Sequence, residues 1–555
     1  MKSSSFSNIK SILFLCTFII ISVVSGCKKK SQKKGFSSDS SVYSSQNYTN
    51  LTLDSQTVIS FLKVNPVSNS VSKEVVEFYT KRDNQLGWFN QNGMTCAAPN
   101  FHNRLQNYSR DFADSSLNNK ALDLMMYNFE ADEKAFMSKI NQVEKLDLLL
   151  TVTFFKYAQK VYGGTTQSSF DHEWFIPRKK KDYQMVLDSL VSSALCEKLQ
   201  EPLNQQYIRL KDKLRQYRII QKKGGFPVIV TTQKTLAVEQ SDSSLLNLKQ
   251  HLFLSGDLKI NDKTIIFTDS LKAAVQLFQR RMGLLESGKI DKLTLIELNH
   301  PIDFRIKQMM VNMERLRWIP EKMESNYLLI NIPEFRLHIF ENEKQVWVTN
   351  VVVGKAVTKT SIFKGNLSQI ILNPYWGIPT SIVRNEILPK LKENSNYLED
   401  NNMEVFAGKN VINANSINWN KYENSVPFDF RQKPGKDNAL GKMKFMFPNN
   451  YHIYLHDTPS KSHFGNTKRA FSHGCIRVEN PKKLAMYLLK NQPVWNEQKV
   501  DKVLTTDTQT GIKVNPSIPV YIAYFTAWVD GNGQLNFRND LYNLDSKLSK
   551  EVFGD

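Results

Sequence analysis

The spacing of apolar residues divides the chain into a helical first part and a strand-rich second part. Between about residues 56 and 225, apolar positions recur at helical intervals, most strongly over 146–158. After residue 320 the pattern changes to alternation, with strand-like runs at 327–332, 335–340 and 346–353. Turn residues rather than helices separate these runs, which favours an antiparallel β domain over βαβ units. The expected fold class is therefore multidomain α+β.

Two further changes of pattern mark smaller units. Around residues 240–300, apolar positions and Gly-Asp turns predict a compact unit of two helices. Between residues 376 and 443, the β alternation gives way to a helical pattern and then to an Asn-rich stretch. An interruption of this length is usually functional when it is ordered. A passive surface excursion is the alternative.

The first 55 residues have the composition of an export signal followed by a tether. Two lysines precede an apolar run over 12–24, which is short for a membrane span but suits a signal peptide. The run ends in V-S-G-C, which resembles a bacterial lipobox, so we expect 1–27 to be a lipoprotein signal peptide with Cys27 lipidated. Ordinary secretory cleavage and an uncleaved anchor are the alternatives. Residues 28–55 are rich in Lys, Ser and Asn, which predicts a flexible linker.

The chain is basic, with 73 Lys and Arg against 53 Asp and Glu and a formal charge of +20. In a cytosolic protein this balance would indicate nucleic acid as a partner. An export signal argues against nucleic acid, and the basic residues are scattered along the chain. We therefore expect an anionic cell-wall matrix as partner, and a location on the periplasmic side of the envelope with the N-terminal lipid in the membrane.

Five cysteines are present, two of them in the N-terminal segment up to Cys27. In an oxidising compartment Cys96 and Cys196 could form one disulfide, which would leave Cys475 as a free thiol. Separate buried thiols at Cys96 and Cys196 agree with the sequence equally well.

The most informative stretch runs from residue 451 to 481 and reads YHIYLHDTPSKSHFGNTKRAFSHGCIRVENP. Its alternating start predicts a strand that ends at His456, and a polar loop follows over 457–469. The chain then reaches Ser472-His473-Gly474-Cys475 before a second short apolar run. One imidazole and one thiol can therefore meet at one end of a sheet.

A thiol in this setting has a defined chemical use. Only the thiolate attacks, so a catalytic Cys475 needs a nearby imidazolium, which His456 can supply, or backbone amides. Gly474 permits a sharp turn that would aim its own amide and that of Cys475 at an oxyanion. A buried structural cysteine is the alternative, and the polar surroundings and Arg477 weaken it.

A His followed by such a loop and S-H-G-C-x-R-V resembles the L,D-transpeptidase (YkuD-like) catalytic domain, which remodels bacterial peptidoglycan. The stretches Y-L-H-D-T-P at 454–459 and N-A-L-G at 438–441 resemble its large periplasmic YcbB-like branch. The resemblance implies that Cys475 is the acylated nucleophile and His456 the general base. The supporting residues would be Ser472, His473, Gly474, Arg477, Asp457 and Tyr454. Asp457 would orient His456 or cap the next turn, with a backbone carbonyl as the alternative orienting group.

The resemblance also implies a division into domains. Residues 56–225 would be a helical scaffold domain, and 305–545 a mostly β catalytic domain in which 376–443 form a capping insertion over the substrate. Within that insertion Trp376 and Arg431 are candidates for contact with the stem peptide. The order of motifs in 240–300 resembles a peptidoglycan-binding domain. Where relatives carry Thr-Pro after the Val-Gly-Lys strand, this chain has Thr360-Ser361.

The expected function is an L,D-transpeptidase without a cofactor or metal that acylates itself with a tetrapeptide stem, releases D-alanine and makes 3→3 cross-links. With water as acceptor the same site would be a carboxypeptidase or endopeptidase. Two rival interpretations are a non-catalytic peptidoglycan-binding lipoprotein and a zinc site built from His452, His456, His473 and Cys475.

Overall fold

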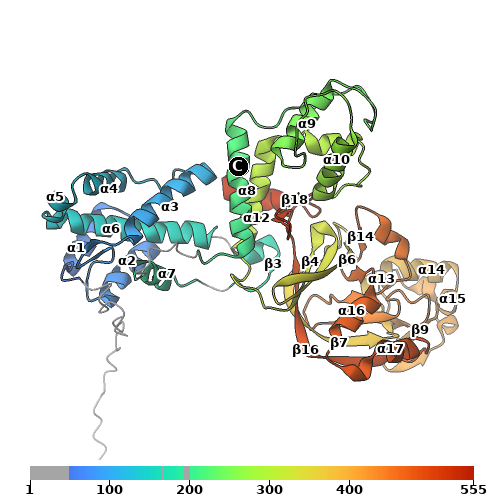
Figure 1. The fold of residues 1–555 in the computed structure, drawn as a ribbon. Coiled ribbons are helices and arrows are strands. Elements are labelled where there is room, and N and C mark those ends of the chain that lie inside the picture. The colour runs from blue at the N-terminus through green and yellow to red at the C-terminus, as the bar shows by residue number, and fades with distance from the viewer. Residues whose placement is uncertain (1–48, 166–167, 179–180, 193–200, 424, 555) are drawn as a thin grey trace, which may run out of the picture.

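The computed structural model describes residues 49–554 except 166–167, 179–180, 193–200 and 424. The proposed signal peptide, Cys27 and most of the linker lie outside these residues. Figure 1 shows a helical region at one end of the molecule and a β-rich region at the other, with α8 (Gln205–Lys222) and α12 (Ile302–Leu316) between them. Within the described part, no helix is long and apolar enough to cross a bilayer. The α+β fold class is confirmed.

The helical region packs around α6 (Ile140–Tyr157), which is apolar on nearly every side. Its buried Asp147 accepts hydrogen bonds from the amides of Gly87 (3.1 Å) and Trp88 (2.7 Å) and from the hydroxyl of Tyr79 (2.6 Å). Three donors satisfy a carboxylate that burial alone would disfavour. The surrounding elements are α1 (Ser55–Val64), α2 (Asn69–Lys81), β1 (Phe89–Asn90), β2 (Gly93–Met94), α3 (Ala97–Phe112), α4 (Lys120–Ala131), α5 (Glu133–Met137), η2 (Ala158–Gly163), η3 (Ser169–His172) and α7 (Tyr183–Val191).

The β-rich region is a closed barrel. Its strands are β4 (Tyr327–Asn331), β5 (Arg336–Glu341), β6 (Lys344–Gly354), β7 (Ile362–Leu372), β12 (Met443–Met446), β13 (Leu455–His456), β15 (Ile476–Val478) and β16 (Thr510–Ala523). They pair in the order β12-β13-β15-β6-β5-β4-β16-β7, and β7 pairs back to β12. The helices α16 (Pro481–Leu488) and α17 (Glu497–Leu504) follow β15.

The expectation of a purely antiparallel domain was wrong. The pairs β13–β15 and β4–β16 are parallel, as is the pair of β6 with β14 (Ala470–Ser472). Residues 457–475 leave from the end of β13 and cross back to the edge of the sheet where β13 begins, so β15 starts beside the start of β13. Alternation along each strand predicts which face is buried, but it does not predict the direction of the neighbouring strand.

The insertion expected over residues 376–443, which we call the capping insertion after its expected role, is an ordered unit with its own core. Four strands pair in the order β10-β9-β11-β8, where β8 is Trp376–Gly377, β9 Met403–Ala407, β10 Asn410–Ile412 and β11 Asp429–Gln432. The helices are α13 (Thr380–Ile382), η5 (Val383–Ile387), α14 (Leu388–Glu393) and α15 (Tyr397–Asp400). Their buried side chains, among them Leu391, Trp419 and Phe430, form a hydrophobic cluster separate from the main core.

The small helical unit has three helices where two were expected: α9 (Ser244–Leu254), α10 (Asp269–Met282) and α11 (Lys292–Leu298). The third has seven residues, too few to show a clear helical period. Its start is marked by Asp291, whose carboxylate accepts from the amide of Thr294 at 2.8 Å.

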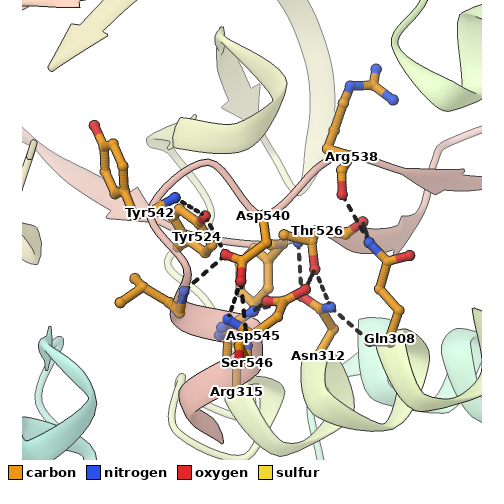
Figure 2. Close-up of polar contacts among 12 residues, drawn as sticks. Gln308, Asn312, Arg315, Tyr524, Thr526, Arg538, Asp540, Tyr542, Asp545 and Ser546 are labelled. Carbon is orange, nitrogen blue, oxygen red and sulfur yellow. Dashed lines mark hydrogen bonds and ion pairs between the residues drawn. The ribbon is translucent and has the colours of Figure 1, made fainter. Parts of the chain in front are cut away.

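Other contacts connect the helical parts to the barrel. The strand β3 (Trp174–Phe175) of the helical region pairs in parallel with β7. Figure 2 shows Asn312 and Arg315 of α12 reaching Thr526 and Asp545, beyond the end of β16. The segment includes β17 (Ala527–Val529), β18 (Leu535–Phe537) and α18 (Leu544–Phe553). The barrel is thus joined to α12 through its C-terminal segment.

Candidate active site

Three adjacent strands bring five polar side chains to one face of the barrel sheet, which we call the catalytic face. Lys444 lies opposite His456 in the β12–β13 pair, and His456 lies opposite Arg477 in the β13–β15 pair. Residues directly paired, and those two positions apart, share a face of a sheet. The catalytic face therefore carries Lys444, Tyr454, His456, Cys475 and Arg477. The intervening residues Leu455 and Ile476 are 0% exposed on the other side.

Cys475 is a partly exposed free thiol immediately before β15. Its Sγ lies 3.5 Å from the carbonyl oxygen of His452. Burial raises the pKa of the Cys475 thiol, while Tyr454 and the charges of Lys444 and Arg477 act in the opposite direction. At neutral pH the resting side chain is a thiol.

His456 is 5% exposed, and its environment keeps it neutral. Burial lowers its pKa to about 3, and the charges of Arg477 and Lys444 act in the same direction. The expected imidazolium beside the thiol is therefore replaced by a neutral imidazole, which can accept a proton.

The ring of His456 is oriented by the backbone. Its Nδ1 lies 2.5 Å from the carbonyl oxygen of Asp457. The Asp457 carboxylate instead accepts from the amide of Lys442 at 2.9 Å and pairs with Lys461 at 2.5 Å. Of the two orienting groups considered from the sequence, the structure shows the carbonyl in this position.

Residues 472–475, the catalytic turn, are held by their own hydrogen bonds. The Ser472 hydroxyl donates to the carbonyl oxygen of Cys475 (2.6 Å) and accepts from the amide of Gly474 (3.2 Å). Gly474 has φ +120°, which a side chain would strain. Thr360 donates its hydroxyl to the carbonyl oxygen of Gly474 at 2.7 Å. The buried pair of Ser472 and Thr360 thus defines the turn.

The two amides expected to form an oxyanion hole differ in their hydrogen bonding. The amide of Gly474 already donates to Ser472, so it is not free in this state. The amide of Cys475 has no acceptor among the residues that the structure describes, which leaves it available to an oxyanion.

His473 connects the catalytic turn to the capping insertion. Its Nε2 lies 2.9 Å from Oε1 of Glu386 on η5, and the two side chains are 44% and 50% exposed. The insertion therefore contacts the catalytic turn through a pair of side chains that are both exposed to water.

The two substrate-contact candidates have different surroundings. Trp376 acts on Tyr454 of the catalytic face, whose pKa it lowers against the larger effect of burial. The Arg431 guanidinium pairs with Glu404 at 2.8 Å and lies 4.5 Å from the ring centroids of both Tyr375 and Phe406. Trp376 is thus at the site, whereas Arg431 is engaged within the insertion.

The remaining candidates concern metal and disulfide chemistry. Within the described ranges no three His, Cys, Asp or Glu side chains converge as metal ligands, so His452, His456, His473 and Cys475 do not form such a group. Cys96 is disulfide-bonded. Cys196 lies outside the described residues, so its pairing with Cys96 stays a prediction.

Sequence reasoning missed Lys444, Glu386 and the role of Thr360. Lys444 belongs to a short strand whose sequence, M-K-F-M, carries the alternation of a β-strand. Its position beside His456 follows only from the register of β12 on β13.

Comparisons with known proteins agree with this geometry. Residues 325–495 match the family model for the L,D-transpeptidase catalytic domain, YkuD, and residues 73–214 match a model described as a scaffold domain. A putative L,D-transpeptidase of Haemophilus influenzae is 34% identical over 244 residues, which cover 44% of this chain and 49% of the relative. The match thus spans about half the length of that relative.

Two solved L,D-transpeptidases are also similar. The one from Xylanimonas cellulosilytica is 14% identical and covers 53% of this chain and 100% of its own, with a TM-score of 0.18. The one from Stackebrandtia nassauensis is 13% identical and covers 53% and 97%, with a TM-score of 0.21. Scores this low carry no argument. The similarity to L,D-transpeptidases rests on the two family-model matches and on the Haemophilus relative.

Proposed function

We propose, from the premise that residues 325–495 are an L,D-transpeptidase catalytic domain of the YkuD family, that the chain joins peptidoglycan stems through an acyl-enzyme on Cys475. The observation that carries this proposal is the catalytic face, where a free thiol and a neutral, backbone-oriented imidazole project from adjacent strands. A neutral imidazole is the protonation state that a general base requires.

Acylation uses His456 first as a base and then as an acid. His456 takes the thiol proton while Sγ of Cys475 attacks the carbonyl carbon of the third stem residue. The tetrahedral oxyanion is held by the amide of Cys475, a donor worth about 3 kcal/mol in other acyl-transfer sites. The C–N bond then breaks, His456 returns its proton to the amine of the leaving D-alanine, and a thioester remains.

Deacylation transfers the acyl group to an acceptor. An amine of a neighbouring stem attacks the thioester carbonyl, its proton passes through His456 to the departing sulfur, and a 3→3 cross-link forms. Water in the same position would give a carboxypeptidase or endopeptidase. The products of the reaction distinguish these two acceptors.

The wider assignment to a YcbB-like, envelope-anchored enzyme is part of the same proposal. A scaffold match precedes the catalytic domain, and an ordered insertion with its own core interrupts the barrel; both support that branch. Stem peptides and glycan are the proposed partners, with Cys27 carrying the lipid that anchors the protein on the periplasmic side of a membrane.

Intact mass spectrometry of the purified protein tests the chemistry. With a disaccharide-tetrapeptide or a carbapenem, we expect an adduct on Cys475 that is absent in Cys475→Ser and at least a hundredfold slower to form in His456→Ala, since general-base catalysis contributes about 10²–10⁴-fold. His300→Ala, at the end of the small helical unit, serves as the matched histidine control.

Three outcomes would contradict the proposal. The first is turnover in Cys475→Ser. The second is activity that a chelator removes and zinc restores. The third is wall binding without an adduct or turnover, which would make the protein a binder.

A further inference from the structure

A lysine without a carboxylate partner lies on the catalytic face. Lys444 projects from β12 beside His456, and its Nζ is 3.9 Å from the centroid of the Tyr454 ring. Among the described residues no Asp or Glu pairs with it. A carboxylate would cancel the charge of the ammonium, whereas an aromatic ring holds it in place and leaves the charge available.

A second cation reinforces the first. Arg477 lies on the other side of His456, and its buried Nε has no hydrogen-bond partner in the described structure. Two half-buried cations without a counter-charge are costly unless an anion forms between them. Cys475 is the side chain on this face that becomes that anion when its proton passes to His456, whereas burial raises the pKa of Tyr454 and keeps its phenol protonated.

We propose that Lys444, with Arg477, stabilises the thiolate of Cys475 in the place that an imidazolium takes in other cysteine enzymes. Tyr454 connects the two groups, because continuing the β13–β15 register places it opposite Cys475 and its ring positions the ammonium of Lys444. This inference deepens the proposed function and rests on it for its catalytic meaning.

The step balances without a proton from Lys444. The thiol proton goes to His456, and the negative charge on sulfur lies in the field of the ammonium. When the S–C bond forms, that charge moves to the substrate oxygen. Lys444 stays protonated throughout and acts by charge alone.

The test is the rate at which iodoacetamide alkylates Cys475 in the full protein as a function of pH, followed by peptide mass mapping. In Lys444→Met we expect the thiol pKa to rise by about one unit, which slows alkylation at pH 7 about tenfold. Lys444→Arg restores the rate to within about threefold, because it keeps the charge. A profile for Lys444→Met that superimposes on the parent would overturn the inference.

Matched variants separate charge from structure. Lys442→Met removes the same charge from the residue just before β12, but that ammonium lies 4.0 Å from Asp507, so we expect an unchanged profile. Loss of rate in Lys442→Met equal to that in Lys444→Met would assign the effect to net charge and overturn the inference. If Lys444→Met fails to fold by circular dichroism, Lys444→Gln takes its place.

Alkylation requires no peptidoglycan, so the two proposals can fail separately. A shifted thiol profile without any acyl transfer to stems would refute the proposed function and keep Lys444 as the thiolate-stabilising charge. Acyl transfer with an unshifted profile would keep the function and refute the role of Lys444.

Discussion

At the scale of single residues, the catalytic pair rests in its uncharged form. Burial raises the pKa of Cys475 and lowers that of His456 to about 3. The two shifts act together, since each disfavours the charged form of its group. The thiolate–imidazolium pair of many cysteine enzymes is therefore not the resting state here, and in the proposed mechanism proton transfer accompanies attack on the substrate.

The raised pKa of Cys475 and the lowered pKa of His456 predict how the alkylation rate depends on pH. Because the Cys475 thiol titrates above its ordinary range, the rate with iodoacetamide should rise about tenfold per pH unit between pH 5 and 8. No acid plateau is expected, because a neutral His456 does not hold a thiolate at low pH. In His456→Ala the slope should stay the same. A plateau between pH 5 and 7 that vanishes in His456→Ala would show a preformed ion pair instead.

At the scale of elements, the C-terminal segment braces the catalytic turn. The Tyr542 hydroxyl donates to the carbonyl oxygen of Gly354 (2.8 Å) and accepts from the amide of Thr360 (3.2 Å). Thr360 in turn donates to Gly474. Figure 2 shows Tyr542 held in place by its backbone amide, which donates a hydrogen bond to the hydroxyl of Tyr524. The position of the Cys475 amide thus depends on a segment after the last barrel strand.

Removing the hydrogen bonds of the Tyr542 hydroxyl should slow acylation and leave the pKa of the Cys475 thiol unchanged. Tyr542→Phe deletes one hydroxyl and leaves two buried backbone groups without a partner, at a cost of about 1–3 kcal/mol in unfolding free energy. We expect about tenfold slower carbapenem acylation, measured by intact mass, with an unchanged alkylation profile. Tyr487→Phe on α16 is the matched control. Equal acylation rates in both variants would show that the turn does not depend on Tyr542.

At the scale of the whole molecule, the barrel has firm and weak attachments. On one side β3 joins β7, and Arg281 of α10 donates to the carbonyl oxygen of Leu535 in the C-terminal segment that follows the barrel, at 2.5 Å. On the other side, Glu386 of the capping insertion forms an exposed pair with His473 of the catalytic turn. An exposed pair is worth less than about 1 kcal/mol, so the insertion can leave the turn at little cost.

Loss of this contact should affect substrate retention more than chemistry. In Glu386→Gln we expect KM for a tetrapeptide donor to rise by up to about fivefold, the equivalent of 1 kcal/mol, with kcat nearly unchanged. Steady-state kinetics at low and high salt measure this, and the salt dependence of KM should be smaller in the variant. Glu399→Gln on α15 of the same insertion is the control. A hundredfold loss of kcat would place Glu386 in the chemistry.

Local patterns were sufficient to predict much of this protein. The change from helical to alternating spacing separated the α and β parts, and the S-H-G-C stretch with a preceding strand marked Cys475 and His456. Periodicity and short motifs involve neighbours within a few residues, so they can be read directly from the chain. The third helix of the small unit was not predicted, because seven residues are too few to show a helical period.

The sequence by itself marked Cys475 and His456 as candidates for the chemistry and separated the helical part from the strand-rich part, because these properties arise from residue type and short-range spacing. The tertiary structure alone decided the closure of β7 on β12, the parallel direction of β15, the neutral state of His456, and the placing of Lys444, Thr360 and Tyr542 around Cys475. The physical reason is that strand register, burial and electrostatic fields depend on segments that meet only after the chain has folded.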